Sequence, residues 1–214
     1  ETPSAGALFA AASCAHEAQE PAWLDALVDL AQALPDESSG LVSAFGWADP
    51  ARLRGVGAAL LESPDPGRSG RGLAACELHR ADAGAALERA LAAPEPALRA
   101  RALRMAGRVG RLDLLERCLG LLHDRDPACA FEAARAALLL GDRRLAVPAL
   151  ETCAQAKGAD APAALCLLLL ALPESQAESR LASMAHEGRE SRRLLRGIGL
   201  VGDPHFLPSL VRKV

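Results

Sequence analysis

Cysteines and histidines are the side chains of this 214-residue chain best suited to nucleophilic or metal chemistry. No two of the six cysteines form the Cys-x-x-Cys pair that binds zinc or exchanges disulfides, and the five histidines are isolated from one another. His123 lies near Asp124 and Asp126, but a capped loop between two helices is expected there. No nucleophile–base pair or Gly-rich phosphate loop is recognisable either. We therefore predict no catalytic residue, no metal site and no cofactor.

The cysteines are scattered through apolar, helix-like positions, which indicates buried free thiols in a reducing cytosol. They are Cys14, Cys76, Cys118, Cys129, Cys153 and Cys166. The longest apolar run, residues 163–172, is far shorter than the roughly 20 residues that a membrane-spanning helix needs. We expect a cytoplasmic protein without a membrane-inserted segment.

The elements that position these residues follow a repeat of about 31 residues. Its clearest copy has an opener at Asp126-Pro127, an Ala/Leu-rich stretch to Leu140, a break at Gly141-Asp142 and a second apolar stretch over 145–150. A step of about 31 residues places Ala75, Ala106, Ala137 and Leu168 at one repeat position. Two-helix repeats of this length stack side by side, so the pattern predicts a solenoid with a long curved surface. We expect close helix packing around Ala106 and Ala137, with no room for a larger side chain.

The chain is expected to be all-α, because apolar segments of helical length are separated by turn residues and no strand pattern is present. Half of its residues are apolar but only 3% are aromatic, which suits helices that pack through Ala and Leu. The helices are predicted to come in pairs. The pairs are 5–19 with 23–34; a helix that starts at 41 with one that starts at 50; 66–80 with 82–92; 97–109 with 112–122; 128–140 with 143–156; 161–171 with 174–186; and 192–201 with 204–214. Residues 1–40 are predicted to form an irregular N-terminal helical pair, and residues 41–214 a single continuous array.

The Asp-Pro openers, the paired alanines of the first helix, the Gly-Asp hinge and the segment Val147-Pro148-Ala149-Leu150 resemble HEAT repeats of the short bacterial kind. The likeness is strongest over 94–122 and 126–156 and extends to 190–214. It implies a right-handed α-solenoid of about six to seven HEAT-like helical hairpins, in which second helices line the concave face.

A narrower resemblance rests on five short segments in the same order, namely residues 46–47, 78–82, 105–111, 138–143 and 199–204. They resemble a family of uncharacterised bacterial HEAT-like proteins that are often encoded beside type VI secretion genes. The resemblance covers residues 41–214 and implies a setting, not an activity.

Charged side chains recur at matching places in the predicted second helices. They are Glu88, Arg89, Glu116, Arg117, Glu151 and Arg180. Stacking of the repeats would align them as a partner-binding stripe on the concave face, with the arginines contacting carboxylates of the partner and the glutamates fixing its register. Salt bridges within the array are an equally good explanation of the same residues.

Two further positions depart from the repeat. His79-Arg80 replaces the glycine of the later hinges, and we expect these side chains to cap carbonyl groups at a helix end rather than to contact a partner. Trp47 lies at another hinge, and we expect it to pack under the next repeat, although tryptophan is enriched in binding hot spots.

Charge is distributed unevenly, with a formal net charge of −3. Residues 1–51 contain no Lys or Arg, whereas Arg189, Arg192, Arg193, Arg196, Arg212 and Lys213 make the end of the chain basic. Opposite charges at the two ends of the chain are compatible with docking in one orientation. Solvent-exposed faces of the terminal repeats explain the same charges better.

Three classes of function fit a helical array. A non-catalytic scaffold or adaptor that binds another protein is favoured. A nucleic-acid binder resembling the helical-repeat DNA glycosylases would need a basic, aromatic-lined concave face, but this chain is acidic with four Phe and two Trp. An enzyme resembling the HEAT-repeat bilin lyases finds no support among the reactive side chains. The expected partner is therefore a protein and not a nucleic acid.

Overall fold

The computed structural model describes residues 3–186, 191–202 and 204–206. In these residues the chain forms thirteen α-helices and three short 3-10 helices, without a strand. Helices account for 79% of the described residues, which confirms the all-α prediction. Contacts divide the chain into two compact units, unit 1 over Glu1–Arg111 and unit 2 over Leu112–Val214. The predicted division into residues 1–40 and 41–214 stays a prediction.

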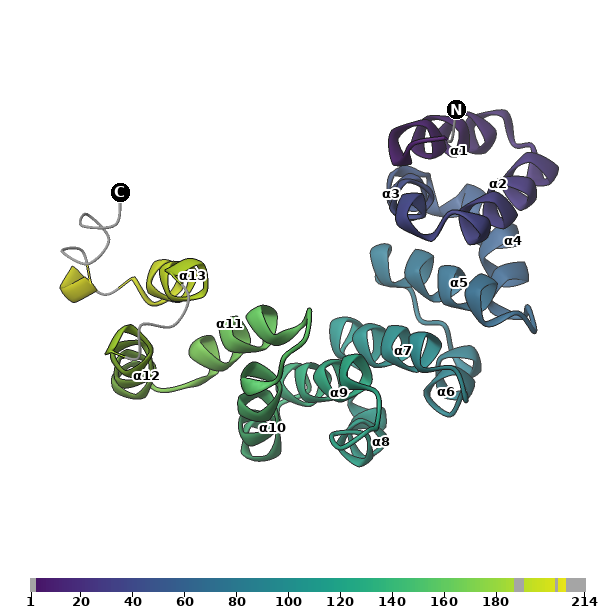
Figure 1. Cartoon of the computed structure of the whole chain (residues 1–214). Helices are drawn as coiled ribbons and strands as arrows, with labels where there is room; N and C mark the ends of the chain where they lie inside the picture. Colours follow the sequence, from purple (N-terminus) through teal and green to yellow (C-terminus); the bar gives the residue numbers. More distant parts are fainter. Residues whose placement is uncertain (1–2, 187–190, 203, 207–214) are drawn as a thin grey trace. The chain divides into compact units, whose positions relative to one another are not determined.

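Unit 1 contains seven α-helices in its described residues (Figure 1). They are α1 (Ala5–Ala18), α2 (Pro21–Ala33), α3 (Ser39–Trp47), α4 (Pro50–Leu61), α5 (Pro66–Leu78), α6 (Ala85–Leu91) and α7 (Pro96–Val109), with the 3-10 helix η1 (Pro35–Glu37) before α3. The odd-numbered helices stack on one another, α1 on α3, α3 on α5 and α5 on α7. The even-numbered helices pack beside them, α2 on α1, α4 on α5 and α6 on α7. Unit 1 thus has a layer of first helices and a layer of second helices.

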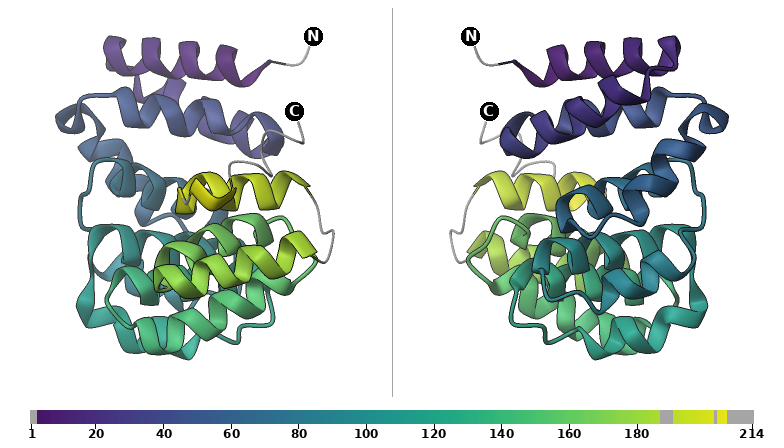
Figure 2. Two further views of the ribbon diagram at one scale, coloured as in Figure 1. Left: turned by 90° about the vertical axis from the view of Figure 1, so that its left-hand side faces the viewer. Right: turned by 90° about the vertical axis from the view of Figure 1, so that its right-hand side faces the viewer.

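Unit 2 repeats this arrangement (Figure 2). Its described elements are η2 (Leu112–Leu114), α8 (Leu115–Gly120), α9 (Pro127–Leu139), α10 (Arg143–Gln155), α11 (Ala161–Ala171), α12 (Glu174–His186), α13 (Ser191–Val201) and η3 (Pro204–Phe206). Here α9, α11 and α13 stack in order, while α10 packs against both α9 and α11, and α12 packs against α13. None of the helices in the described part of the chain combines the length and the apolar character needed to span a bilayer.

The Asp-Pro openers start helices as predicted. The carboxylates of Asp49, Asp65 and Asp126 accept hydrogen bonds from backbone N–H groups of the first turn at 2.7–2.9 Å, and each is followed by proline at the first helical position. Asp142 caps α10 in the same way through the N–H of Leu145 at 2.8 Å. These hydrogen bonds satisfy backbone N–H groups that have no acceptor within the helix. Proline at the first helical position costs no hydrogen bond, because the N–H group that it lacks would have had no acceptor within the helix.

Three first helices, α5, α7 and α9, also end alike, in a left-handed residue followed by a backbone hydrogen bond to the carbonyl five residues earlier, whereas α3 and α11 end in an extended residue. The N–H groups of Ala81, Arg111 and Asp142 donate to the carbonyls five residues earlier at 2.9–3.0 Å. The residue before each donor has a positive φ: 52° at Arg80, 75° at Gly110 and 101° at Gly141. Glycine adopts this conformation without strain, so Arg80 is the unfavourable member of the set.

The four positions aligned by the repeat interval have the same burial. Ala75, Ala106, Ala137 and Leu168 are all buried, with Ala106 and Ala137 fully enclosed. Glycine serves the same close packing at Gly40, where an added Cβ would lie only 1.9 Å from the carbonyl oxygen of Ala5.

Some helix boundaries differ from those predicted. The second helices expected over 82–92 and 112–122 are shorter, as α6 begins only at Ala85 and α8 is preceded by η2. Gly84 has a φ of 53°, which does not occur within an α-helix, so α6 begins after it. At the ends of α6 and α8 the backbone hydrogen bonds join residues three apart, as in a 3-10 helix. Of the helix expected over 204–214, η3 covers Pro204–Phe206; the remainder lies outside the described residues, as do Arg189, Arg212 and Lys213.

Enlarging a buried alanine tests the packing of the first helices. We expect Ala137→Leu to lower the free energy of unfolding by about 1–3 kcal/mol, because the side chain has no space between stacked helices. Urea denaturation followed by circular dichroism measures the change. Ala58→Leu, on the exposed side of α4, is the matched control and should unfold like the parent. Equal stability of the two variants would show that the position is not tightly packed.

The helix ends provide a second test. We expect Arg80→Gly to stabilise the chain by roughly 1 kcal/mol, and Gly141→Ala to destabilise it by roughly the same amount, because a side chain costs free energy at positive φ. A Cβ on Gly141 would meet no atom of the described residues within 4 Å, so the loss would come from the backbone alone. Thermal denaturation should show shifts of opposite sign; shifts of the same sign would contradict this account.

Candidate protein-binding surface

The six charged residues predicted to form a stripe all lie on second helices. In unit 1, Glu88 and Arg89 belong to α6. Arg89 bonds to Glu62, the C-cap residue of α4, at 2.8 Å, and Glu88 lies 3.7 Å from the guanidinium of Arg111. Both charged residues of α6 therefore form ion pairs within unit 1.

In unit 2, Glu116 and Arg117 are exposed on α8. Glu151 of α10 and Arg180 of α12 are brought together, with 2.8 Å between Arg180 Nη1 and Glu151 Oε1. The pairs Glu62–Arg89 and Glu151–Arg180 each join consecutive second helices, which is the arrangement that salt bridges within the array would give. Exposed pairs of this kind contribute only about 0–1 kcal/mol each. Partner binding by the six residues stays a prediction.

A different set of residues in unit 2 places exposed leucines at about the repeat interval. Leu139, Leu170 and Leu200 lie near the ends of α9, α11 and α13, about one repeat apart, and are 51%, 61% and 40% exposed. Because these three helices stack in order, the three side chains follow one another along the same layer. We call them the leucine row. Exposed large apolar side chains that gather on one surface mark interaction sites more often than single ones do.

Basic side chains accompany the leucine row. Arg135 precedes Leu139 by four residues and Arg196 precedes Leu200 by four, so each lies one turn away on the same side of its helix. Arg135 is 3.3 Å from Glu132 of its own helix. Arg192, Arg193 and Arg196 line a hollow of about 220 Å³ between α13 and α11. Two arginines thus lie one turn from leucines of the row, and one of them, Arg135, is already paired with Glu132.

Unit 1 exposes apolar side chains at the same repeat position, and here one prediction was wrong. Trp47, at the end of α3, is 83% exposed instead of packed under the next repeat. Leu78 at the end of α5 lies close to Gly46, where an added Cβ would be 3.3 Å from Leu78 Cδ1. The ring of Trp47 instead meets Phe9 of α1 edge-on, with 6.3 Å between the ring centroids.

His79 bonds to a carbonyl group at a helix end, but that helix is α3 and not α5, at whose end His79 itself lies. Its Nε2 lies 2.7 Å from the carbonyl oxygen of Phe45, in the last turn of α3. That carbonyl is one that a helix end leaves without an intrahelical partner. His79 therefore joins α5 to α3, while Arg80 is exposed.

The cysteines differ in how far they are exposed to solvent. All six cysteines are free thiols, of which Cys118 and Cys129 are buried and Cys14 is exposed. Burial raises the pKa of Cys118 to about 11, so it is a thiol and not a nucleophilic thiolate at neutral pH. No three His, Cys, Asp or Glu side chains of the described residues come close enough together to hold a metal ion.

Acidic side chains of the N-terminal region form ion pairs with arginines of unit 1. Arg68 of α5 bonds to Asp25 and Asp29, one turn apart on α2. Arg52 of α4 lies 2.7 Å from Glu17 of α1. These carboxylates therefore link helices of unit 1.

Comparison of the chain with models of protein families, with curated proteins and with solved structures finds no match.

The leucine row was missed by sequence reasoning, although its signal was present. Leu139, Leu170 and Leu200 recur with the repeat, but so do Ala137 and Leu168, which are buried. A shared period does not tell which member of each helix faces outward, so the row emerges only from the packing.

Charge reversal tests the predicted stripe. We expect Arg89→Glu combined with Arg117→Glu to leave the melting temperature nearly unchanged, because exposed ion pairs add little stability. If the stripe binds a partner, the double variant should capture that partner from an extract of the native host less well than the parent. Unfolding of the variant, or unchanged capture, would show that the stripe is not the binding surface.

Proposed function

We propose that the chain is a non-catalytic scaffold, built as a right-handed α-solenoid of six to seven HEAT-like hairpins, that binds another protein. The repeated helix openers and the shared cap at the ends of α5, α7 and α9 support repeats of one kind. Layers of first and second helices within each unit support stacking of these repeats.

The observation that carries this proposal is the leucine row. Three exposed leucines on consecutive stacked helices offer apolar area that water solvates poorly, and a protein partner can cover it. Arg196 beside the row favours carboxylates in that partner. The partner surface that fits is amphipathic, with apolar side chains spaced to meet the leucines and acidic side chains at their edge.

The proposed setting is the bacterial cytoplasm, near a type VI secretion system. Six free cysteines support a reducing compartment. The secretion link rests on the resemblance of residues 41–214 to HEAT-like proteins encoded beside such genes. An apolar row favours a protein partner over nucleic acid, whose binding depends mainly on phosphate contacts.

Replacing the row tests the proposal. We expect the triple variant Leu139→Ser, Leu170→Ser and Leu200→Ser to fold with nearly the parental melting temperature, because the replaced side chains are exposed. A partner captured by the parent from the native host, identified by mass spectrometry and then purified, should bind the triple variant at least about tenfold more weakly.

Leu112→Ser is the matched control, because Leu112 is 66% exposed but lies outside the row. It should bind the purified partner like the parent. If the triple variant binds the partner as tightly as the parent, the leucine row is not the binding surface. If only the Arg89/Arg117 double variant loses affinity for the partner, the stripe is the binding surface instead.

A further inference from the structure

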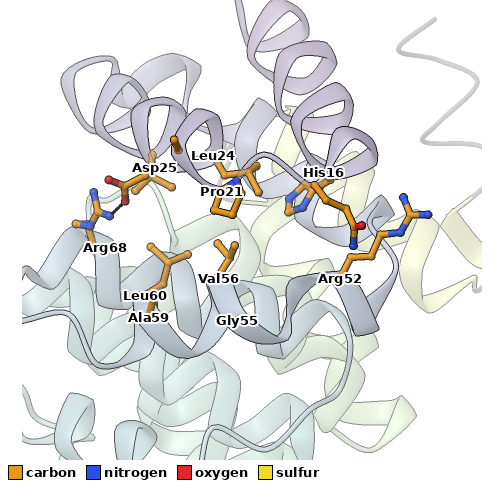
Figure 3. Close-up of a pocket in the computed structure, with 13 residues that line it drawn as sticks. His16, Pro21, Leu24, Asp25, Arg52, Gly55, Val56, Ala59, Leu60 and Arg68 are labelled. Carbon is orange, nitrogen blue, oxygen red and sulfur yellow. Dashed lines mark hydrogen bonds and ion pairs between the residues drawn. The ribbon is translucent and has the colours of Figure 1, made fainter.

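A groove in unit 1 lies between α2 and α4 and opens to solvent (Figure 3). Its volume is about 800 Å³. Leu24 and Val28 of α2 face it from one side, and Val56 and Leu60 of α4 from the other. A mostly apolar space of this volume is typical of sites for small molecules and exceeds what one protein side chain would fill.

One buried polar side chain lines this groove. His16, in the last turn of α1, lies at the end of the groove near Arg52 (Figure 3) and is only 3% exposed. Within the described part of the chain, neither of its ring nitrogens has a hydrogen-bond partner. Its ring packs edge-on against Phe45, with 5.6 Å between the centroids. A buried polar group without a partner is unfavourable, so His16 has unused hydrogen-bonding capacity. Both ring nitrogens are closed to solvent, so a ligand bonds to them only when a small shift of the ring or its neighbours opens them to the groove.

The imidazole of His16 is neutral at neutral pH. Burial lowers its pKa, and the nearby carboxylate of Glu17 opposes this effect only in part. A neutral imidazole has one nitrogen that donates and one that accepts. A hydroxyl group, which also donates and accepts, is its complement.

The charged side chains at the groove are already paired. Arg68 bonds to Asp25 at one end, and Arg52 lies 2.7 Å from Glu17 near the other. Both guanidinium groups thus have carboxylate partners from unit 1. This pairing favours an uncharged ligand over an anion.

Gly55 leaves space in the wall of the groove. A Cβ at Gly55 would meet no atom of the described residues within 4 Å, so helix packing does not require glycine here. Glycine weakens a helix interior relative to alanine. The missing side chain at Gly55 leaves this part of the wall open, so a larger residue there would enter the groove. Gly57 has the same free surroundings on the same helix but lies outside the groove.

We propose that this groove binds a small neutral amphiphile, whose apolar body lies between α2 and α4 and whose single hydroxyl group bonds to His16. The hydroxyl can donate to one ring nitrogen or accept from the other. This site is separate from the leucine row and does not depend on it.

Alkylbenzenes that differ in one group test the proposal on the full chain. 4-Butylphenol carries the hydroxyl, butylbenzene lacks it and 4-butylbenzoate replaces it with a charge. We expect 4-butylphenol to bind about tenfold more tightly than butylbenzene, by titration followed with NMR, and more tightly than 4-butylbenzoate. In His16→Phe the preference for the phenol over butylbenzene should disappear.

Two leucine substitutions on α4 give the matched control. Gly55→Leu should abolish binding of 4-butylphenol because its side chain enters the groove, whereas Gly57→Leu should keep the affinity within about twofold. The proposal fails if 4-butylphenol does not bind, if butylbenzene binds equally well, or if the two leucine variants bind alike. Tighter binding of 4-butylbenzoate would indicate an anion site. Equal affinity for N-acetyltyrosinamide would indicate that the groove accepts a tyrosine of a protein partner.

Discussion

Close stacking of the first helices through small side chains is the constraint on which the rest of each unit depends. Ala106 and Ala137 are fully buried, and Gly40 faces the carbonyl of Ala5 where even one added carbon would overlap it. Small residues let helix backbones approach closely, and dispersion contacts then accumulate over the whole interface. Because aromatic residues make up only 3% of the chain, the closeness of the helices replaces the bulk of large side chains.

This stacking fixes the rotation of each first helix and so decides which side chains face outward. Leu168 is buried by the stack, and Leu170, two residues later, must point to the opposite side of α11 and is 61% exposed. The leucine row is thus a direct consequence of the buried alanines and leucines beside it. A scaffold can change such outward positions without loss of its core, which makes them suited to recognition.

The second helices obey a weaker constraint, since they pack mainly against first helices. They are joined across the surface by ion pairs such as Glu151–Arg180, which contribute little to stability. Where two second helices are not drawn together by large side chains, space remains between them. The groove between α2 and α4 is such a space, with glycine in one wall and a buried histidine that has no hydrogen-bond partner among the described residues.

The sequence by itself determined the helical class, the repeat interval, the helix openers and the buried position shared by Ala75, Ala106, Ala137 and Leu168. These follow from local chemistry: Asp-Pro caps, glycine at positive φ and helical periodicity each act over a few residues. Only the tertiary structure decided the exposure of Trp47, the pairing of Arg89 with Glu62, the capping of α3 by His79 and the groove beside His16. Each of these joins residues about 27 to 40 apart or depends on the rotation of one helix against another. A repeat interval gives the order of the helices, but the contacts between helices decide which side chain faces water, a partner or the core.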